Sequence, residues 1–267
     1  KNKIMFKTKE EKIIFDNFIK KGYLIFNIKD KQKLNLLRKK VVKFIQKNSK
    51  KSTSGKYNEE LYLNNSHLFI EKKNQNNLRL SLINYLNSDK DFKFDYYNFA
   101  KEYLEKIVGN ELAMQQRINL SIQFPKDNSS LLPLHSDTWA GDSPFETVVW
   151  LPLVDCYKSK SMYIIPPNKM KLVNSLIKKK MTTDQMFLKI KKYVTWIKIN
   201  YGQVLIFNQN LPHGNIVNKE KETRLSFNCR FKSIFAPYGD KKIGEFFDPI
   251  TLKPASKIGM IYKYPDA

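Results

Sequence analysis

The feature that most restricts how this chain can fold is a series of short, strand-like runs between residues 115 and 231. In the first run, over residues 118–124, apolar and polar side chains alternate with the two-residue period of a strand that buries one face. The later runs are separated by Pro, Gly, Asn and Asp, and they cover residues 147–154, 162–165, 195–199, 203–207 and 224–231. Many short strands with turn residues between them predict an antiparallel sandwich or barrel.

The first part of the chain has a different, helical period. Thr8 and Glu11 form a capping-box pattern ahead of the first apolar residues, and Gly22 is suited to the end of that helix. A short strand-like run over residues 23–28 follows. Apolar side chains then recur at helical spacing in three further segments, which are residues 34–45, 78–86 and 96–108. We therefore expect residues 1–114 to form a helical support for the β-rich part.

Residues 167–193 interrupt the strand series with a Lys-rich, helix-like insert. An insert of this length in a compact β domain is typically functional or mobile. Two interpretations remain open: a lid whose lysines attract a phosphorylated substrate, and a solvated helix of a basic protein. The expected organisation is one α+β domain over residues 1–267, in which the β core (115–231) carries the insert and is followed by a C-terminal extension (232–267).

Composition argues against several classes of protein. Apolar residues make up 42% of the 267 residues and aromatic residues 13%, which is enough for a substantial core. No run approaches the ~18 consecutive apolar residues of a membrane-spanning helix, and no apolar leader follows the basic start, so we expect a cytoplasmic protein. Cys156 and Cys229 are too few for a disulfide scaffold, and we expect them to be free thiols rather than metal ligands.

The net charge of +23 comes from 48 lysines and arginines, of which only five are arginine. The lysines are spread along the whole chain instead of forming a local basic patch interleaved with aromatic residues. This distribution argues against a nucleic-acid-binding protein, which would also favour arginine for phosphate contacts. A generally positive field remains suited to attracting a small anionic substrate.

Two of the three histidines lie at positions that suggest a metal site. His135 and Asp137 form a His-x-Asp pair, and His213 lies in a turn just after a later strand-like run. Each residue alone has an ordinary explanation as a loop or turn residue bonded to the backbone, and His67, which has no partner pattern, is read as structural. Together, two imidazoles and one carboxylate are the facial triad of non-haem Fe(II) sites, which leaves room for a bidentate co-substrate and O2.

Such a site needs a fixed cation for the far carboxylate of 2-oxoglutarate, and Arg224 is our candidate. Arg224 lies 11 residues after His213, and Ser226 places a hydroxyl on the same strand face. Arginine binds a carboxylate through two parallel hydrogen bonds, which lysine does less well. An arginine at this position of a Lys-rich chain therefore indicates a need for the guanidinium rather than an ordinary salt bridge. Arg230 is the reserve candidate, and it is also a candidate contact for the substrate.

Four motifs give the chain a resemblance to the non-haem Fe(II)/2-oxoglutarate-dependent oxygenases, namely Leu-His-Ser-Asp at 134–137, Ser-Met-Tyr-Ile-Ile-Pro-Pro at 161–167, Leu-Pro-His-Gly at 211–214 and Arg-Leu-Ser at 224–226. Residues 134–155 and 231–240 are most similar to the streptomycin-biosynthesis StrG-like group. The piece at 161–166 resembles phytanoyl-CoA-hydroxylase-like members, although residues 166–169 read Pro-Pro-Asn-Lys where those proteins have Pro-Gly-Ser-His. The resemblance covers roughly residues 115–245.

The resemblance implies a double-stranded β-helix, which is a jelly roll related to the cupins, with N-terminal helices and a helical insert added. It implies that His135, Asp137 and His213 hold Fe(II), and that Arg224, assisted by Ser226, binds 2-oxoglutarate. These proteins use 2-oxoglutarate and O2 to oxidise a substrate and release succinate and CO2.

The remaining candidates have open alternatives. Asn119 and Gln123 share a strand face and point toward the co-substrate or substrate, or else form a solvent-facing polar edge. Trp139 either walls the pocket or is a core aromatic residue. Asp142 and Glu146 lie near the triad in sequence and are expected to be structural or substrate-facing rather than ligands.

Likeness to the StrG-like group implies a small-molecule substrate of the sugar or nucleotide-sugar type, in a bacterial carbohydrate or natural-product pathway. A hydroxylase of amino acids or peptides in the same superfamily is one alternative. A cupin-like binding protein or isomerase without oxygen chemistry is another.

Overall fold

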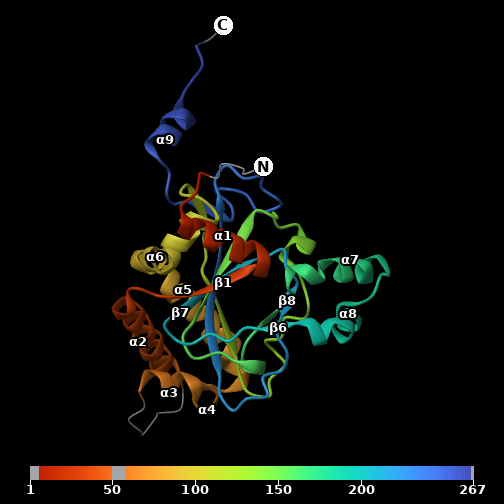
Figure 1. Cartoon of the computed structure of the whole chain (residues 1–267). Coiled ribbons are helices and arrows are strands. Elements are labelled where there is room, and N and C mark those ends of the chain that lie inside the picture. The colour runs from red at the N-terminus through yellow and green to blue at the C-terminus, as the bar shows by residue number, and fades with distance from the viewer. Residues whose placement is uncertain (1–5, 50–57, 266–267) are drawn as a thin grey trace.

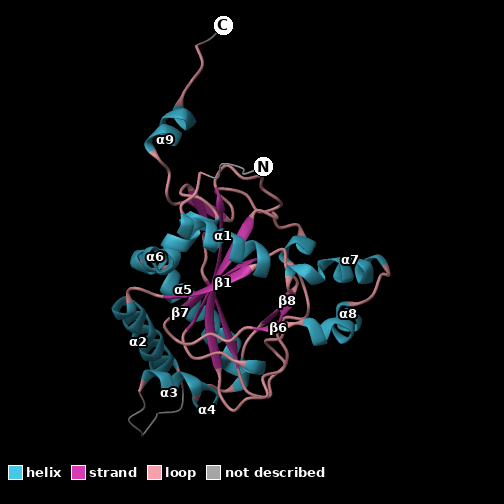
Figure 2. Cartoon of the chain, viewed as in Figure 1, coloured by secondary structure: helices cyan, strands magenta, loops and turns pink. Residues whose placement is uncertain are grey.

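Two antiparallel sheets form the centre of the computed structural model, which describes residues 6–49 and 58–265 (Figures 1 and 2). The strands of the large sheet, in spatial order, are β1 (Tyr23–Asn27), β7 (Gln203–Asn208), β4 (Glu146–Pro152), β9 (Arg224–Ser233), β2 (Leu112–Gln115) and β10 (Phe247–Pro249). β3 (Asn119–Gln123) also pairs with β9, on the same edge as β2. The small sheet consists of β6 (Thr195–Trp196), β5 (Tyr163–Ile164) and β8 (His213–Gly214).

The long strand β9 organises the large sheet. Its first half pairs with β3, from Arg224 opposite Gln123 to Asn228 opposite Asn119, and its second half pairs with β2. On its other side it pairs with β4 along seven residues. Because side chains alternate along a strand, the polar residues of β9 share one face, and its apolar residues point to the opposite face. β9 therefore presents polar side chains toward the small sheet and apolar side chains toward the helices.

Helices cover the apolar face of the large sheet. They are α1 (Lys9–Lys21), α2 (Lys31–Asn48), α3 (Glu59–Asn64), α4 (Ser66–Phe69), α5 (Gln75–Asn87) and α6 (Lys90–Ile107). α5 lies against β3 and α6 against β7 (Figure 1). The hydroxyl of the buried Tyr96 donates a hydrogen bond to the carbonyl of Val149 (2.8 Å), and Phe92 packs edge-on against Phe227. These contacts join the helices to the strands that carry the candidate site.

The predicted N-terminal helices and their caps are confirmed. Thr8 accepts from the backbone N–H of Glu11, whose carboxylate accepts from the backbone of Thr8, so the capping box is complete. Gly22 ends α1 with a φ of 76°, a left-handed conformation that glycine adopts without strain. The apolar period over residues 34–45 lies in α2, and the two later helical segments lie in α5 and α6.

The insert at 167–193 folds as a helical hairpin, α7 (Met170–Lys178) and α8 (Thr183–Ile190). Val173 and Leu176 of α7 and Met186 and Ile190 of α8 are buried in a cluster that includes Tyr163 of β5. The hairpin therefore packs on the small sheet, and it projects from the body on the side away from α2 (Figure 1). Its helical character confirms the sequence-based expectation.

The last helix, α9 (Pro254–Ile261), stands away from the two sheets and buries none of its residues (Figure 2). Before it, β10 pairs with β2, so residues after 232 contribute a strand to the large sheet. Cys156 and Cys229 are both buried free thiols, as expected. None of the helices within residues 6–49 and 58–265 has the length and apolar character needed to cross a membrane.

Candidate metal centre and its cavity

Backbone pairing brings the two candidate histidines together. The N–H of His135 donates to the carbonyl of His213 (3.0 Å), and the N–H of His213 donates back to the carbonyl of His135 (2.8 Å). His213 is also paired with Ile164 of β5, so the small sheet fixes its position. The two rings lie 4.3 Å apart between centroids. Residues 78 positions apart in the sequence are thus held side by side by main-chain hydrogen bonds rather than by side-chain packing.

Gly214 permits this close approach. A Cβ added at Gly214 would lie 2.7 Å from the carbonyl oxygen of Leu132 and 2.7 Å from the hydroxyl of Tyr163. Only glycine leaves room for the segment that carries His135 to cross the small sheet at this point.

Asp137 joins the histidines because the chain turns immediately after His135. Asp137 begins a short 3-10 helix (Asp137–Ala140), which directs its carboxylate back toward the imidazoles. The intervening Ser136 is buried, and its hydroxyl lies 3.1–3.2 Å from the carbonyls of Gln209 and Asn210. This contact ties the His-x-Asp segment to the turn that precedes His213.

The orientation of both imidazoles turns the same nitrogen, Nε2, toward the centre of the cluster, and Nε2 of His135 lies 3.7 Å from Oδ1 of Asp137. Nδ1 of His135 is 2.7 Å from the carbonyl of Pro133, and Nδ1 of His213 is 2.8 Å from the carbonyl of Leu211. Because a carbonyl only accepts, each Nδ1 carries the proton and each Nε2 keeps its lone pair. Burial, together with the nearby His135, lowers the pKa of His213 to about 4. His213 is therefore neutral at physiological pH, which is the form that binds a metal.

The candidate ligand atoms of His135, Asp137 and His213 all lie within 4.8 Å of one another. Two imidazole nitrogens and one carboxylate suit a divalent first-row metal, and this ligand set with open positions is the one used by non-haem Fe(II) enzymes. The donor set therefore fits the metal that the sequence predicts.

The triad opens into a cavity of about 290 Å³ between the two sheets. One part of the wall is apolar and consists of Leu132, Val148, Trp150, Met162 and Phe207. The other part is polar and includes Ser121, Asn215, Arg224, Asn228 and Arg230. β9 contributes three of these polar residues at alternate positions along a single face, so the strand period places them together.

Arg224 is buried in this wall without an acidic partner. Its side chain is 3% exposed, and none of the ion pairs in the described residues includes it. Nη2 donates to the hydroxyl of Ser121 (3.1 Å), but Nε has no hydrogen-bond partner, and neither does the buried hydroxyl of Ser226. Burial lowers the pKa of Arg224. An unpaired buried guanidinium is costly, and a bound anion would remove that cost.

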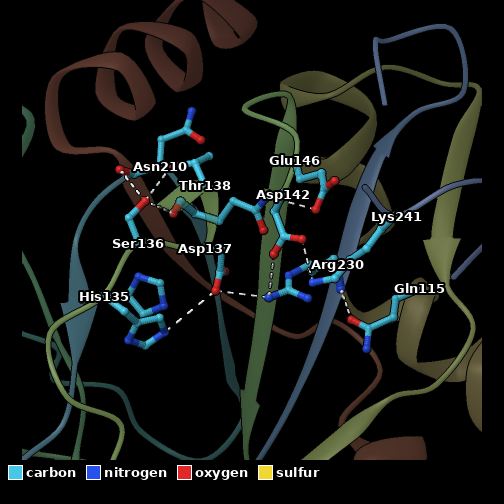
Figure 3. A network of polar contacts seen from close by, with 12 residues as sticks. Gln115, His135, Ser136, Asp137, Thr138, Asp142, Glu146, Asn210, Arg230 and Lys241 are labelled. Atoms are coloured by element: carbon cyan, nitrogen blue, oxygen red, sulfur yellow. Dashed lines mark hydrogen bonds and ion pairs between the residues drawn. The ribbon is translucent and has the colours of Figure 1, made fainter. Parts of the chain in front are cut away.

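Arg230 has the opposite environment. Its Nη2 lies 3.1 Å from Oδ1 of Asp137 and 3.2 Å from Oδ2 of Asp142, and Asp142 also pairs with Lys241 at 2.6 Å (Figure 3). Behind this group, Glu146 is buried and accepts a hydrogen bond from Gln209 (2.9 Å). Burial, more than any other cause, raises the pKa of Glu146. Asp142 and Glu146 thus belong to the support of the site and do not join the His-Asp-His cluster.

The other predicted residues lie less centrally. Gln123 is buried and donates to the carbonyl of Ile216 (2.7 Å), and its own carbonyl oxygen has no partner. Asn119 lies at the far end of β3 and is not among the residues that line the cavity. Trp139 is 41% exposed and does not line it either. Ser121, between the two predicted residues of β3, is the one whose side chain is hydrogen-bonded to Arg224.

Sequence reasoning missed Asn215, Asn228 and Lys241. Asn228 was within reach of prediction, because it continues the alternation that begins at Arg224 and Ser226. Asn215 and Lys241 carry no local signal, since their roles depend on contacts with Leu132 and Asp142, respectively.

No protein-family model matches the sequence, and no curated protein sequence matches it either. Solved structures do match the fold. ThoJ, a non-heme monooxygenase in complex with nickel, aligns with a TM-score of 0.54 and 11% identity, covering 91% of this chain and 85% of ThoJ. SnoN, a non-heme alpha-ketoglutarate-dependent epimerase from nogalamycin biosynthesis, aligns with a TM-score of 0.54 and 12% identity, over 88% of this chain and 85% of SnoN.

HygX from Streptomyces hygroscopicus, with nickel and 2-oxoglutarate bound, aligns with a TM-score of 0.52 and 13% identity, over 87% of this chain and 89% of HygX. At these identities the likeness concerns the fold. It confirms the predicted α+β class, with a cupin-like jelly roll of the kind found in 2-oxoglutarate-dependent enzymes. Likeness to the StrG-like or phytanoyl-CoA-hydroxylase-like groups stays a prediction.

Proposed function

We propose that this protein is a non-haem Fe(II)- and 2-oxoglutarate-dependent oxygenase that acts on a small molecule. The observation that carries the proposal is the pairing of two features in one cavity. One is the His135, Asp137 and His213 cluster with its inward-facing Nε2 atoms, and the other is the buried, unpaired Arg224. Arg224 Nε has no hydrogen-bond partner in the empty protein, and both features have a use when metal and co-substrate are present.

His135, Asp137 and His213 would hold the metal. The carbonyls of Pro133 and Leu211 keep both imidazoles in the tautomer that presents Nε2 to the ion. When bound, Fe(II) and 2-oxoglutarate supply the activation of O2, with conversion of 2-oxoglutarate to succinate and CO2. The protein contributes ligand geometry and a cavity that limits access of water.

Arg224 would bind the far carboxylate of 2-oxoglutarate. Of the two arginines in the cavity wall, Arg230 is already paired with two carboxylates, whereas Arg224 has only the hydroxyl of Ser121. A carboxylate that reaches Nε of Arg224 and the hydroxyl of Ser226 would satisfy both buried groups that lack partners. The proposal therefore assigns the co-substrate to Arg224 and not to Arg230.

The proposed substrate is a sugar or nucleotide-sugar type of molecule in a bacterial carbohydrate or natural-product pathway. The cavity combines the aromatic side chains of Trp150 and Phe207 with the side-chain amide of Asn228. Aromatic faces and amides together suit a ring that carries hydroxyl groups. SnoN, which is described as an epimerase from nogalamycin biosynthesis, supports a natural-product setting.

The test is substrate-stimulated release of succinate. Purified protein with Fe(II), 2-oxoglutarate and O2 is incubated with panels of sugars, nucleotide-sugars, amino acids and peptides, and succinate and products are identified by mass spectrometry. A product that is 16 mass units heavier (the mass of one oxygen atom) indicates hydroxylation, and an isomer of the substrate indicates epimerisation. Stimulation only by amino acids or peptides would move the assignment to a hydroxylase of those molecules. A protein that binds metal but never consumes 2-oxoglutarate would instead be a cupin-like binding protein or isomerase.

A further inference from the structure

Four residues of alternating charge form a chain of ion pairs that begins at the candidate metal ligand Asp137 and ends at Lys241 (Figure 3). Asp137 pairs with Arg230, Arg230 pairs with Asp142, and Asp142 pairs with Lys241. The side chain of Asp142 is 2% exposed, compared with 11% for Asp137, 19% for Arg230 and 31% for Lys241. Asp142 is thus the most deeply buried charge of the four, although it lies farther from the histidines than Asp137.

The backbone fixes both ends of the central pair. Arg230 lies in the middle of β9, opposite Val148 of β4, and its N–H donates to the side chain of Gln115 (3.2 Å). Asp142 follows Gly141, whose φ of 90° turns the chain, and the carbonyl of Gly141 accepts from the N–H of Asp240 (3.2 Å). The Arg230–Asp142 contact therefore joins the sheet to the turn that follows the metal-ligand segment.

We propose that Asp142 is a positioning residue of the metal site, acting on Asp137 through Arg230. This inference rests on the proposed function, because it assigns Asp137 to the metal. Both carboxylates contact the same nitrogen of Arg230, so Asp142 holds that nitrogen where it meets Oδ1 of Asp137. The carboxylate of Asp137 is thereby kept in one orientation, facing the two imidazoles.

Asp142 also balances charge. A divalent ion bound beside Asp137 is repelled by the guanidinium of Arg230, and the carboxylate of Asp142 compensates that repulsion. Without the negative charge of Asp142, Arg230 would pair with Asp137 alone, and its guanidinium would compete with the metal for the carboxylate oxygens of Asp137. Partners that orient a metal-ligating carboxylate typically change metal affinity by about 10- to 100-fold when removed.

The chain offers a matched pair of variants for the test. Asp142→Asn and Lys241→Gln both break the Asp142–Lys241 ion pair, but only Asp142→Asn removes the charge that faces Arg230. We measure the affinity for Co²⁺ by competition with a chromogenic chelator, without 2-oxoglutarate or substrate, and record the visible d–d spectrum of bound Co²⁺. We expect Asp142→Asn to bind Co²⁺ about 10- to 100-fold more weakly with an altered spectrum, and Lys241→Gln to bind within about threefold of wild type.

An equal loss of Co²⁺ affinity in both variants would overturn the proposal, because it would show that Asp142 only connects the turn to the segment around Lys241. Wild-type affinity and spectrum in Asp142→Asn would also overturn it. If Asp142→Asn does not fold, the double variant Asp142→Asn/Lys241→Gln replaces the buried pair by two neutral groups and carries the same expectation and the same refutation. A wild-type protein that binds no divalent metal would refute the proposed function itself. Tight metal binding in every variant would instead refute only the role of Asp142.

Discussion

Replacing Arg224 with methionine is predicted to stabilise the empty protein and to destroy its affinity for 2-oxoglutarate. Arg224 is 3% exposed, pairs with no carboxylate and leaves Nε without a partner. A buried donor without a partner costs about 1–3 kcal/mol, and methionine fills similar volume without that cost. At roughly 2–4 °C per kcal/mol for a chain of this size, Tm of the metal-free protein should rise by roughly 2–12 °C.

The same substitution removes the partner of the far carboxylate. Truncating one member of a buried, hydrogen-bonded charge pair costs about 2–5 kcal/mol, which corresponds to a roughly 30-fold to several-thousand-fold increase in Kd. The affinity is measured by calorimetric titration of 2-oxoglutarate into the Ni²⁺-loaded protein, and the stability by thermal denaturation of the metal-free protein. The exposed Arg117, substituted in the same way, is the control and should change neither quantity.

Opposite signs for the two effects are the distinctive part of this prediction. A merely structural arginine would lower Tm when replaced and leave the Kd of 2-oxoglutarate within a few-fold of wild type. That pair of results would show that Arg224 does not bind the co-substrate, and it would favour Arg230 in that role.

Three further predictions concern the surroundings of the site. The pKa of His213 is about 4 in the folded state, whereas an unfolded imidazole takes a proton near its ordinary pKa of 6.5. The metal-free protein should therefore lose up to about 3 kcal/mol of its free energy of unfolding between pH 6.5 and pH 4. Urea unfolding across this range should show the loss in wild type and a flatter pH profile in His213→Gln. Gly214→Ala places a Cβ 2.7 Å from the carbonyl of Leu132, so it should lower the free energy of unfolding by about 1–3 kcal/mol and should also abolish metal binding. Thermal denaturation measures the first effect, and a Co²⁺ titration measures the second. Burial raises the pKa of Glu146 above its ordinary 4.5, so the ionised carboxylate lowers the free energy of unfolding at neutral pH. Glu146→Gln, whose amide oxygen can still accept from Gln209, should raise Tm at pH 7, and the increase should be smaller near pH 4. A lower Tm of this variant at pH 7 would contradict the prediction.

The candidate metal ligands could be predicted because their signals are local. His135 and Asp137 are two residues apart, and His213 lies a few residues after the apolar run of β7, which is easy to recognise. Arg224 could be predicted because the period of a strand fixes which side chains share its face. These patterns depend on neighbouring residues along the chain, so no knowledge of the tertiary structure was needed to see them.

The parts that were missed depend on tertiary contacts. β8 is only two residues long and lies in a Pro-His-Gly sequence that is typical of a turn, so its pairing with β5 leaves no period in the sequence. β10 reads Phe-Asp-Pro and is stabilised by its register with β2. On β3, alternation placed Asn119 and Gln123 on one face, but it could not show that the cavity lies over the middle of the strand.

The support around Asp137 was also beyond the reach of sequence patterns. Asp142, Arg230 and Lys241 come from a turn, a central strand and a C-terminal loop, and only the fold places their charges in contact. The sequence offers many lysines and few arginines, but it does not indicate which of them is paired.

The most direct test of the central claim is an anaerobic titration of the metal-free protein with Fe(II) and 2-oxoglutarate, followed by visible absorption. Chelation of the iron by the keto acid gives a weak charge-transfer band, and we expect wild-type protein to show this band and His213→Ala to lack it. Saturation should require one equivalent of each component. If folded wild-type protein holds iron but develops no band on addition of 2-oxoglutarate, the proposed function is wrong, and the cavity is instead the site of a binding protein or isomerase.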